Sequence, residues 1–112
     1  MKIAIPIDGN RLSLHFGHCE KFIMFDIDEG SKNIIKEEIV DAPPHEPGLL
    51  PEWLGGKGVT MIIAGGMGRR AQDLFSERKI DVVIGASADA PKDIVSAYLN
   101  GNLKTGGNIC DH

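Results

Sequence analysis

Two apolar runs in the second half of the chain constrain the fold more than any other feature of the sequence. Val59–Ala64 and Asp81–Ile84 each have the length of one strand and are apolar over most of that length. Such a run is typical of a strand that is buried on both faces of a sheet. A segment with helical spacing follows each run, with inward-facing residues Ala71, Leu74 and Phe75 in one case and Ile94, Val95 and Tyr98 in the other. Since strand–helix–strand connections are almost always right-handed crossovers, this half predicts parallel strands.

The first half of the sequence adds antiparallel strands. Lys2–Asp8 is a short β-branched run that ends in turn residues. Lys21–Asp28 and Asn33–Asp41 are two further strand candidates, and Glu29–Lys32 between them predicts a hairpin. The polar segment Arg11–Cys19 is predicted to be irregular.

A short helix completes the pattern between the two halves. Leu49, Leu50, Trp53 and Leu54 recur at helical spacing after a proline-rich stretch, and a Gly-Gly pair ends the helix. The predicted order is therefore β-β-β-α-β-α-β-α. It indicates an α/β protein with a mixed five-stranded sheet and helices on its faces, a three-layer arrangement similar to the ribonuclease H-like fold.

Length and charge limit the classes of function. The 112 residues are predicted to form a single domain, residues 1–112, because a chain of this size has room for one hydrophobic core. A net charge of −4 and few aromatic residues disfavour nucleic-acid binding. The sequence has no apolar run near the ~20 residues of a membrane span and no charged-then-apolar leader, and its two cysteines do not make a disulfide scaffold. We expect a soluble cytoplasmic protein without nucleic-acid or membrane partners.

Three loops are expected to meet where the parallel strands end, because ligands of such sheets bind beyond the carboxyl ends of the strands. These loops are Gly9–Cys19, Gly65–Gly68 and Gly85–Asp89. The last two open helices, so their N–H groups and positive dipole ends would face one crevice, to which Arg69 and Arg70 add charge. The sequence thus predicts an anion site made of Gly65, Gly66, Met67, Gly68, Arg69 and Arg70.

The alternative for the glycine loop is that its glycines serve only the turn between a strand and a helix, and the two interpretations are evenly balanced. No Walker lysine follows the loop, and its spacing fits no dinucleotide fingerprint. A nucleotide ligand is therefore weakly supported.

Candidate metal ligands are concentrated in two places. His15, His18 and Cys19 lie within five residues, and Cys110 and His112 form a Cys-x-His pair at the end of the sequence. Imidazole and thiolate suit iron, zinc and copper, and five such ligands are enough for a tetrahedral site if the tail folds back. The alternatives are buried packing for a cysteine, simple solvation for a loop histidine and disorder for the last residues. The functional interpretation is favoured for His15, which lies in a loop aimed at the crevice.

The sequence does not predict an enzyme. Ser87 lacks the Gly-x-Ser-x-Gly setting of a hydrolase nucleophile. Asp8 ends the first strand, where a nuclease of this layout would place a metal-binding carboxylate. Two-metal catalysis needs several converging carboxylates, and the next such position is occupied by Gly65 and Gly66.

The sequence resembles the dinitrogenase iron–molybdenum cofactor biosynthesis family, and the resemblance covers essentially the whole chain. The matching pieces are Lys2-Ile3-Ala4-Ile5-Pro6, His15-Phe16-Gly17 with Phe22, Gly65-Gly66-Met67-Gly68 with Arg70-Ala71, Gly85-Ala86, Asp93, Tyr98, Gly101-Asn102-Leu103 and Gly107-Asn108-Ile109-Cys110-Asp111-His112. Each piece alone is weak, but their order and spacing together are specific.

The resemblance implies a ribonuclease H-like domain that binds a metal–sulfur cluster or its precursor without catalysing a reaction. Larger family members deliver iron–molybdenum cofactor intermediates to nitrogenase, and a stand-alone relative holds a molybdenum–copper–sulfide cluster non-covalently. The resemblance assigns a ligand-binding role most firmly to His15, within the segment His15-Phe16-Gly17. Cys19 departs from the family, in which a small residue is common at this position.

We therefore predict a carrier of a molybdenum, iron or copper sulfide cluster, with cluster donor or acceptor proteins as partners. His15, Cys19 or Met67 would serve as supplementary soft ligands. One alternative is a module for a single zinc or iron ion, held by His15, His18, Cys19, Cys110 and His112. Another is a regulatory domain that binds a small anion or a partner protein.

Overall fold

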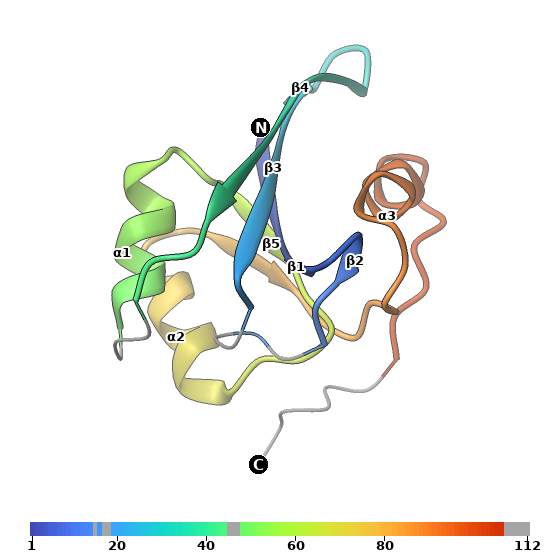
Figure 1. Ribbon diagram of the computed structural model, residues 1–112. Helices are drawn as coiled ribbons and strands as arrows, with labels where there is room; N and C mark the ends of the chain where they lie inside the picture. The colour runs from blue at the N-terminus through green and yellow to red at the C-terminus, as the bar shows by residue number, and fades with distance from the viewer. Residues whose placement is uncertain (15, 17–18, 45–47, 107–112) are drawn as a thin grey trace.

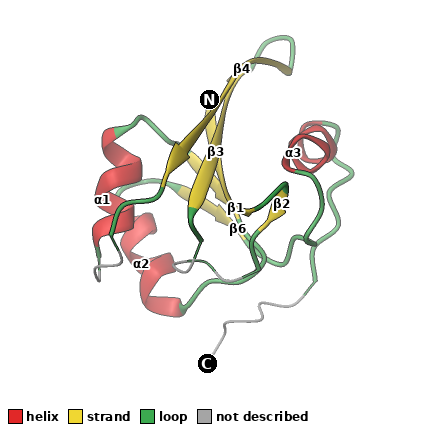
Figure 2. Cartoon of the chain, in the orientation of Figure 1, coloured by secondary structure: helices red, strands yellow, loops and turns green. Residues whose placement is uncertain are grey.

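Four strands precede the first helix, and strands and helices then alternate, in the computed structural model, which describes residues 1–14, 16, 19–44 and 48–106. The strands are β1 (Lys2–Asp8), β2 (Arg11–Leu12), β3 (Lys21–Asp28), β4 (Asn33–Asp41), β5 (Met61–Ile63) and β6 (Asp81–Val83). The helices are α1 (Leu49–Gly56), α2 (Arg69–Glu77) and α3 (Pro91–Leu99). Figure 1 shows these elements along the chain, and Figure 2 distinguishes them by type.

The sheet is mixed, as the sequence predicts. Its strands lie in the order β4-β3-β1-β5-β6, and β2 pairs with β1 beside this path. β1, β5 and β6 are parallel to one another, whereas β3 is antiparallel to both β1 and β4. The parallel second half and the antiparallel hairpin of the first half are both confirmed.

The prediction of five strands is wrong by one short strand. Arg11–Leu12, expected to be irregular, forms β2, with Ile7 opposite Leu12 and Asp8 opposite Arg11. Gly9 makes the reversal possible because its φ of 67° lies in the left-handed region, which glycine adopts readily. Leu12 is 2% exposed, so its burial helps to hold this two-residue strand in place.

β6 is less buried than its apolar sequence suggests. Asp81 is exposed, and the next two residues of the strand are half-buried. The reason is its place in the sheet: among the described strands β6 is last in the order and pairs with β5 alone. β5, its inner neighbour, is buried at all three residues, as predicted.

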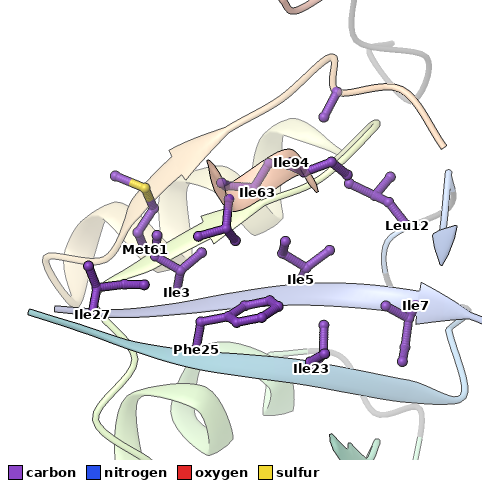
Figure 3. Packing of buried hydrophobic residues seen from close by; sticks show 12 residues of the cluster. Ile3, Ile5, Ile7, Leu12, Ile23, Phe25, Ile27, Met61, Ile63 and Ile94 are labelled. Carbon is purple, nitrogen blue, oxygen red and sulfur yellow. The ribbon is translucent and has the colours of Figure 1, made fainter. Parts of the chain in front are cut away.

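The core has two parts, one on each face of the sheet. Ile3, Ile5 and Ile7 of β1 belong to one buried cluster with Ile94 of α3, and Figure 3 shows this cluster. Ala4, between them in sequence, belongs to the opposite cluster. That second cluster, called the α1/α2 cluster below, contains Ala4, Cys19, Phe22, Met24, Leu54, Val59, Ile62, Ala64, Met67, Phe75 and Ile80. Helices therefore cover both faces, with α1 and α2 on one side and α3 on the other (Figure 1).

The helices are short. Each of the two longest, α2 and α3, has nine residues, whereas a membrane span needs about 20. Within the part of the chain that the structure describes, no helix has the length and apolar character needed to cross a bilayer.

Candidate functional site

Loops from four parts of the chain are bonded to one another beyond the carboxyl ends of the parallel strands. The Gly85 amide donates to the carbonyl of Gly65 at 2.9 Å, and the Ala86 amide donates to the carbonyl of Ala64 at 3.2 Å. The Leu12 amide donates to the carbonyl of Asp89 at 3.0 Å. The predicted meeting of three loops is confirmed for their described residues. We call this region, residues 12–14, 64–68, 85–89 and Gly106, the carboxyl-edge site.

The C-terminal segment reaches the same region. The Gly106 amide donates to the carbonyl of Gly85 at 2.7 Å. Gly85 has a φ of 87°, and a Cβ at this position would collide with the Gly106 carbonyl. Only glycine fits there, because it tolerates both the left-handed backbone and the close approach of a second chain segment. Six residues of the sequence follow this contact.

The glycine loop before α2 is mostly buried. Gly65, Gly66 and Met67 are buried, and the Met67 side chain lies in the α1/α2 cluster. The Gln72 side-chain amide donates to the carbonyl of Met67 at 2.9 Å and closes the loop against the helix. Gly68 is exposed and is the N-cap residue of α2. Of the four residues, Gly68 is therefore the one most open to a ligand.

Positive charge collects at the start of α2. Arg69 and Arg70 are exposed in the first turn, which contains no acidic residue, and no side chain caps the helix. The N-terminus of a helix carries a partial positive charge of its own, so two arginines there are electrostatically unfavourable. The Arg69 Nε lies 3.6 Å from Asp73 Oδ1, but both side chains are exposed, so this pair compensates little of the charge. The charge of this helix start is therefore of the sign that the predicted anion site requires.

Phe16 has a packing role. It is half-buried, with its ring 6.1 Å from Phe22 and 5.6 Å from Phe75, both in edge-to-face geometry. These contacts attach the loop after β2 to the α1/α2 cluster.

Of the five predicted histidine and cysteine ligands, Cys19 is the one that the structure describes. It is 3% exposed and belongs to the α1/α2 cluster. The described residues contain no group of three or more His, Cys, Asp or Glu side chains able to hold a metal ion. His15, Gly17, His18, Cys110 and His112 lie outside the described residues.

Hollows are present around this edge and elsewhere on the surface. One of about 260 Å³ is lined by Leu12, Ser13, Leu14 and Ala88, among others, and so belongs to the carboxyl-edge site. Another, of about 370 Å³, lies beside it, between the first turn of α3 and the segment leading to Gly106. Size alone does not select a site, because a hollow of the same 370 Å³ also lies near Tyr98 at the other end of α3.

A shifted pKa is found at Asp28, in the turn between β3 and β4 and far from the carboxyl edge. The Ser31 hydroxyl donates to Asp28 Oδ2 at 2.7 Å and the Gly30 amide donates to Oδ1 at 3.3 Å. These hydrogen bonds lower the pKa of Asp28. The three residues form the β3–β4 turn, so this shift belongs to turn formation.

Leu14 is one of the described residues of the site that the sequence did not single out. It is 40% exposed, yet its Cδ2 atom lies over Gly65. The available signal was the alternation of Leu12 and Leu14 around Ser13, which is strand-like and directly precedes His15.

Comparison with known proteins places the chain in a family. The model of the dinitrogenase iron-molybdenum cofactor family matches residues 1–101. The chain is 35% identical over 107 residues to protein MJ0580 of Methanocaldococcus jannaschii, a match that covers 93% of this chain and 90% of the other.

Two solved structures are similar to this one. The crystal structure of PH0822 has a TM-score of 0.86 and 31% identity, with 94% of each chain covered. The apo form of the orange protein of Desulfovibrio gigas has a TM-score of 0.70 and 19% identity, with 96% of this chain and 93% of the other covered. At that identity the second likeness concerns the fold alone. The match of the family model over most of the sequence shows that the chain belongs to the dinitrogenase iron-molybdenum cofactor family.

Proposed function

We propose that the protein binds and carries a metal–sulfur cluster, of the molybdenum, iron or copper sulfide type, at the carboxyl-edge site. The observation that carries this proposal is the exposed positive end of α2, with Gly68, Arg69 and Arg70, at the same edge as the segment that leads into His15. Membership of a family named for the iron–molybdenum cofactor supports this class of cargo.

The charge of the cargo fits the charge of the site. Thiomolybdate-type clusters are anions, and a helix N-terminus with free N–H groups binds anions. Such a ligand would also relieve the repulsion between Arg69, Arg70 and the positive end of the α2 dipole. The protein as a whole has a net charge of −4, so this cationic surface is a local exception.

His15 is the direct ligand in this proposal. Its neighbours in the sequence are described: the Leu14 side chain contacts Gly65 of the glycine loop, and the Phe16 ring packs on Phe75 of α2. Cys19 and Met67 are 3% and 0% exposed in the α1/α2 cluster, and this burial favours packing over coordination.

The tail supplies further candidate ligands. Gly106 is bonded to Gly85 at the site, and Cys110 follows Gly106 by four positions in the sequence. His112 and, in the loop after β2, His18 complete the set of proposed soft ligands.

A carrier must release its cargo. Binding mainly through backbone N–H groups and two arginines, with few direct bonds from soft ligands, permits release more readily than a closed four-ligand cage does. The proposal therefore includes no catalysis, a cytoplasmic location, and donor and acceptor proteins that exchange the cluster.

Anaerobic reconstitution tests this function. The purified protein is incubated with tetrathiomolybdate and either copper(I) or iron(II), passed over a desalting column, and analysed for molybdenum, labile sulfide and visible absorption. We expect a retained molybdenum–sulfide chromophore in the wild type and its loss in His15→Ala. One zinc or iron ion per chain without sulfide would replace the proposal with a single-metal module.

A pair of arginine variants tests the role of charge. Arg70→Gln removes a cation from the start of α2, and Arg78→Gln removes one from its far end, so both change the net charge equally. We expect Arg70→Gln to weaken cluster binding severalfold and Arg78→Gln to leave it unchanged. Equal weakening in both would show that only net charge matters and would contradict binding at the helix N-terminus.

A further inference from the structure

β4 is the long open edge of the sheet. Among the described strands it is first in the order and pairs with β3 alone. It has nine residues, whereas β6, at the other end of the order, has three. A very short edge strand is one means by which proteins prevent pairing with another chain. β4 is therefore the edge that has enough length to accept a further strand.

β4 also exposes apolar side chains. Ile35 is 68% exposed and Ile39 is 58% exposed, and these are two of the three large hydrophobic residues exposed in the described part of the chain. A hollow of about 300 Å³ lies beside Ile39, lined by Ile7 and Lys21 among others. A strand laid along β4 would cover apolar surface that the single chain leaves in water.

The charges in the middle of β4 restrict which strand could pair there. Lys36, Glu37 and Glu38 are all exposed. Lys36 and Glu38 lie opposite Asp26 and Met24 in the regular part of the pairing with β3, so their side chains share one face of the sheet. An apolar strand would leave these charges without partners, and like charges directly opposite one another are unfavourable. The occupant of this edge must therefore carry complementary charges.

A second copy of β4 carries those charges when it runs antiparallel with Glu37 at the centre. Lys36 of each copy then lies opposite Glu38 of the other, and Ile35 lies opposite Ile39. Centring the pair on residue 36 or 38 would set two lysines or two glutamates against each other, and an isoleucine against Glu37 in either case. Centring it between two residues would oppose side chains of different faces. The register centred on Glu37 is the one that matches charge with opposite charge.

The two Glu37 carboxylates at this centre are each accompanied by a cation. The Lys92 Nζ of α3 lies 3.9 Å from Glu37 Oε2. Because both side chains are exposed, this ion pair contributes little to the stability of the single chain. In the paired strands, two Lys92 side chains offset the repulsion between the two carboxylates.

We propose that β4 pairs antiparallel with β4 of a second copy of this chain, about a two-fold axis at Glu37, and so joins two sheets into one. Each copy contributes the same surface, as in other two-fold dimers. An interface made of one strand from each copy is at the small end of protein interfaces, so the dimer is weak and forms at about 100 μM protein. β4 contributes no residue to the carboxyl-edge site, so dimerisation is independent of the bound cluster.

Sedimentation velocity of the full chain over a range of concentrations tests this pairing. We expect the mass of the sedimenting species to rise from that of one chain toward that of two in the wild type. A single chain at every concentration would overturn the proposal and leave β4 open to water or to a different protein. Growth beyond two copies would overturn it as well, because the two-fold pairing uses up both edges.

Charge reversal tests the register. Lys36→Glu and Glu38→Lys each set like charges opposite one another twice in the dimer, so we expect each to weaken dimerisation at least tenfold. The double variant K36E/E38K has the net charge of the wild type and restores both opposite-charge pairs, so we expect dimerisation to return. An equal mixture of the two single variants should also dimerise, because one copy then supplies two glutamates and the other two lysines.

A matched control separates this pairing from the effect of net charge. Lys104→Glu makes the same change of charge as Lys36→Glu at an exposed residue outside β4, and it should dimerise as the wild type does. Urea unfolding of dilute samples checks that every variant is folded. Dimers that persist in both single variants, or a mixture of the two that stays monomeric while both are folded, would contradict pairing through β4.

Discussion

The two ends of the sheet differ in how their turns are secured. At the tip of the β3–β4 hairpin, which projects away from the body in Figure 1, the turn is held by its own residues. Asp28 accepts hydrogen bonds from Ser31 and Gly30, and all three are exposed. At the carboxyl-edge site, loops from distant parts of the sequence hold one another, as Gly65 and Gly85 do through their backbones.

This difference has a consequence for function. A turn that is self-contained tolerates change, because its neighbours do not depend on it. Where loops contact one another closely, a change in one loop displaces the others. Substitution of a small residue at such a contact should therefore affect the whole site. The carboxyl edge is therefore the part of the molecule where a single methyl group can alter the site, and the hairpin is its natural control.

Replacing Phe75 should give the largest effect. Phe75 is fully buried and supports Phe16 at the carboxyl edge. Phe75→Ala should lower the free energy of unfolding by about 3–5 kcal/mol through lost burial and the cavity that remains. Ile39→Ala, at a residue that is 58% exposed on β4, should cost less than about 0.5 kcal/mol. Urea titrations of both variants check the contrast, and similar losses would contradict it.

A pair of glycine variants compares the two turns directly. Gly85→Ala places a side chain in the left-handed region and against the Gly106 carbonyl, so it should cost at least about 2 kcal/mol. Gly30→Ala meets only Asp28 Oδ1, at 3.7 Å, and should stay within about 0.5 kcal/mol of wild type. Urea denaturation gives both values. A tolerated Gly85→Ala would mean that the tail is not held at the site.

The fold was largely predictable from the sequence because its signals are local. The apolar run Val59–Ala64 predicts β5, and the hairpin strands have the bounds that their residues indicate. β2 was not predictable in the same way, since two residues carry no periodicity and Leu12 becomes strand only by pairing with Ile7.

The site was less predictable because its key contacts are tertiary. The sequence identifies Gly65 as a glycine in a loop, but the atoms that crowd it come from two other parts of the chain. Similarly, Cys19 has the chemistry of a metal ligand, and its burial in the α1/α2 cluster depends on residues from several elements.

Removal of a positive charge from the start of α2 should stabilise the folded protein. Arg70→Gln takes a cation from the positive end of the helix dipole, so the free energy of unfolding should rise by about 0.3–1 kcal/mol at low salt. The gain should shrink as salt is added, because exposed charges are screened. A loss of stability would show that Arg70 has a structural partner, and the charge argument for the anion site would weaken.

The smallest effect on stability is expected at the hairpin turn, where the contribution of Asp28 depends on pH. Because the folded state lowers the pKa of Asp28, the carboxylate stabilises the turn above its ordinary pKa of 3.8 and loses this contribution as the pH falls through the lower folded value. The difference in stability between wild type and Asp28→Ala should therefore be constant near neutral pH and shrink in acid. A difference that grows on acidification would contradict the sign of the shift.

The most direct test of the account is a map of where the cluster binds. Amide NMR spectra of the protein are recorded as tetrathiomolybdate and copper(I), both diamagnetic, are added without oxygen. We predict shifts at Leu14, at Gly65–Gly68 and at the Gly85–Ala86 turn, with the Asp28–Lys32 turn unchanged. Shifts centred on the hairpin, or none at any residue, would contradict the claim that the carboxyl edge is the cargo site.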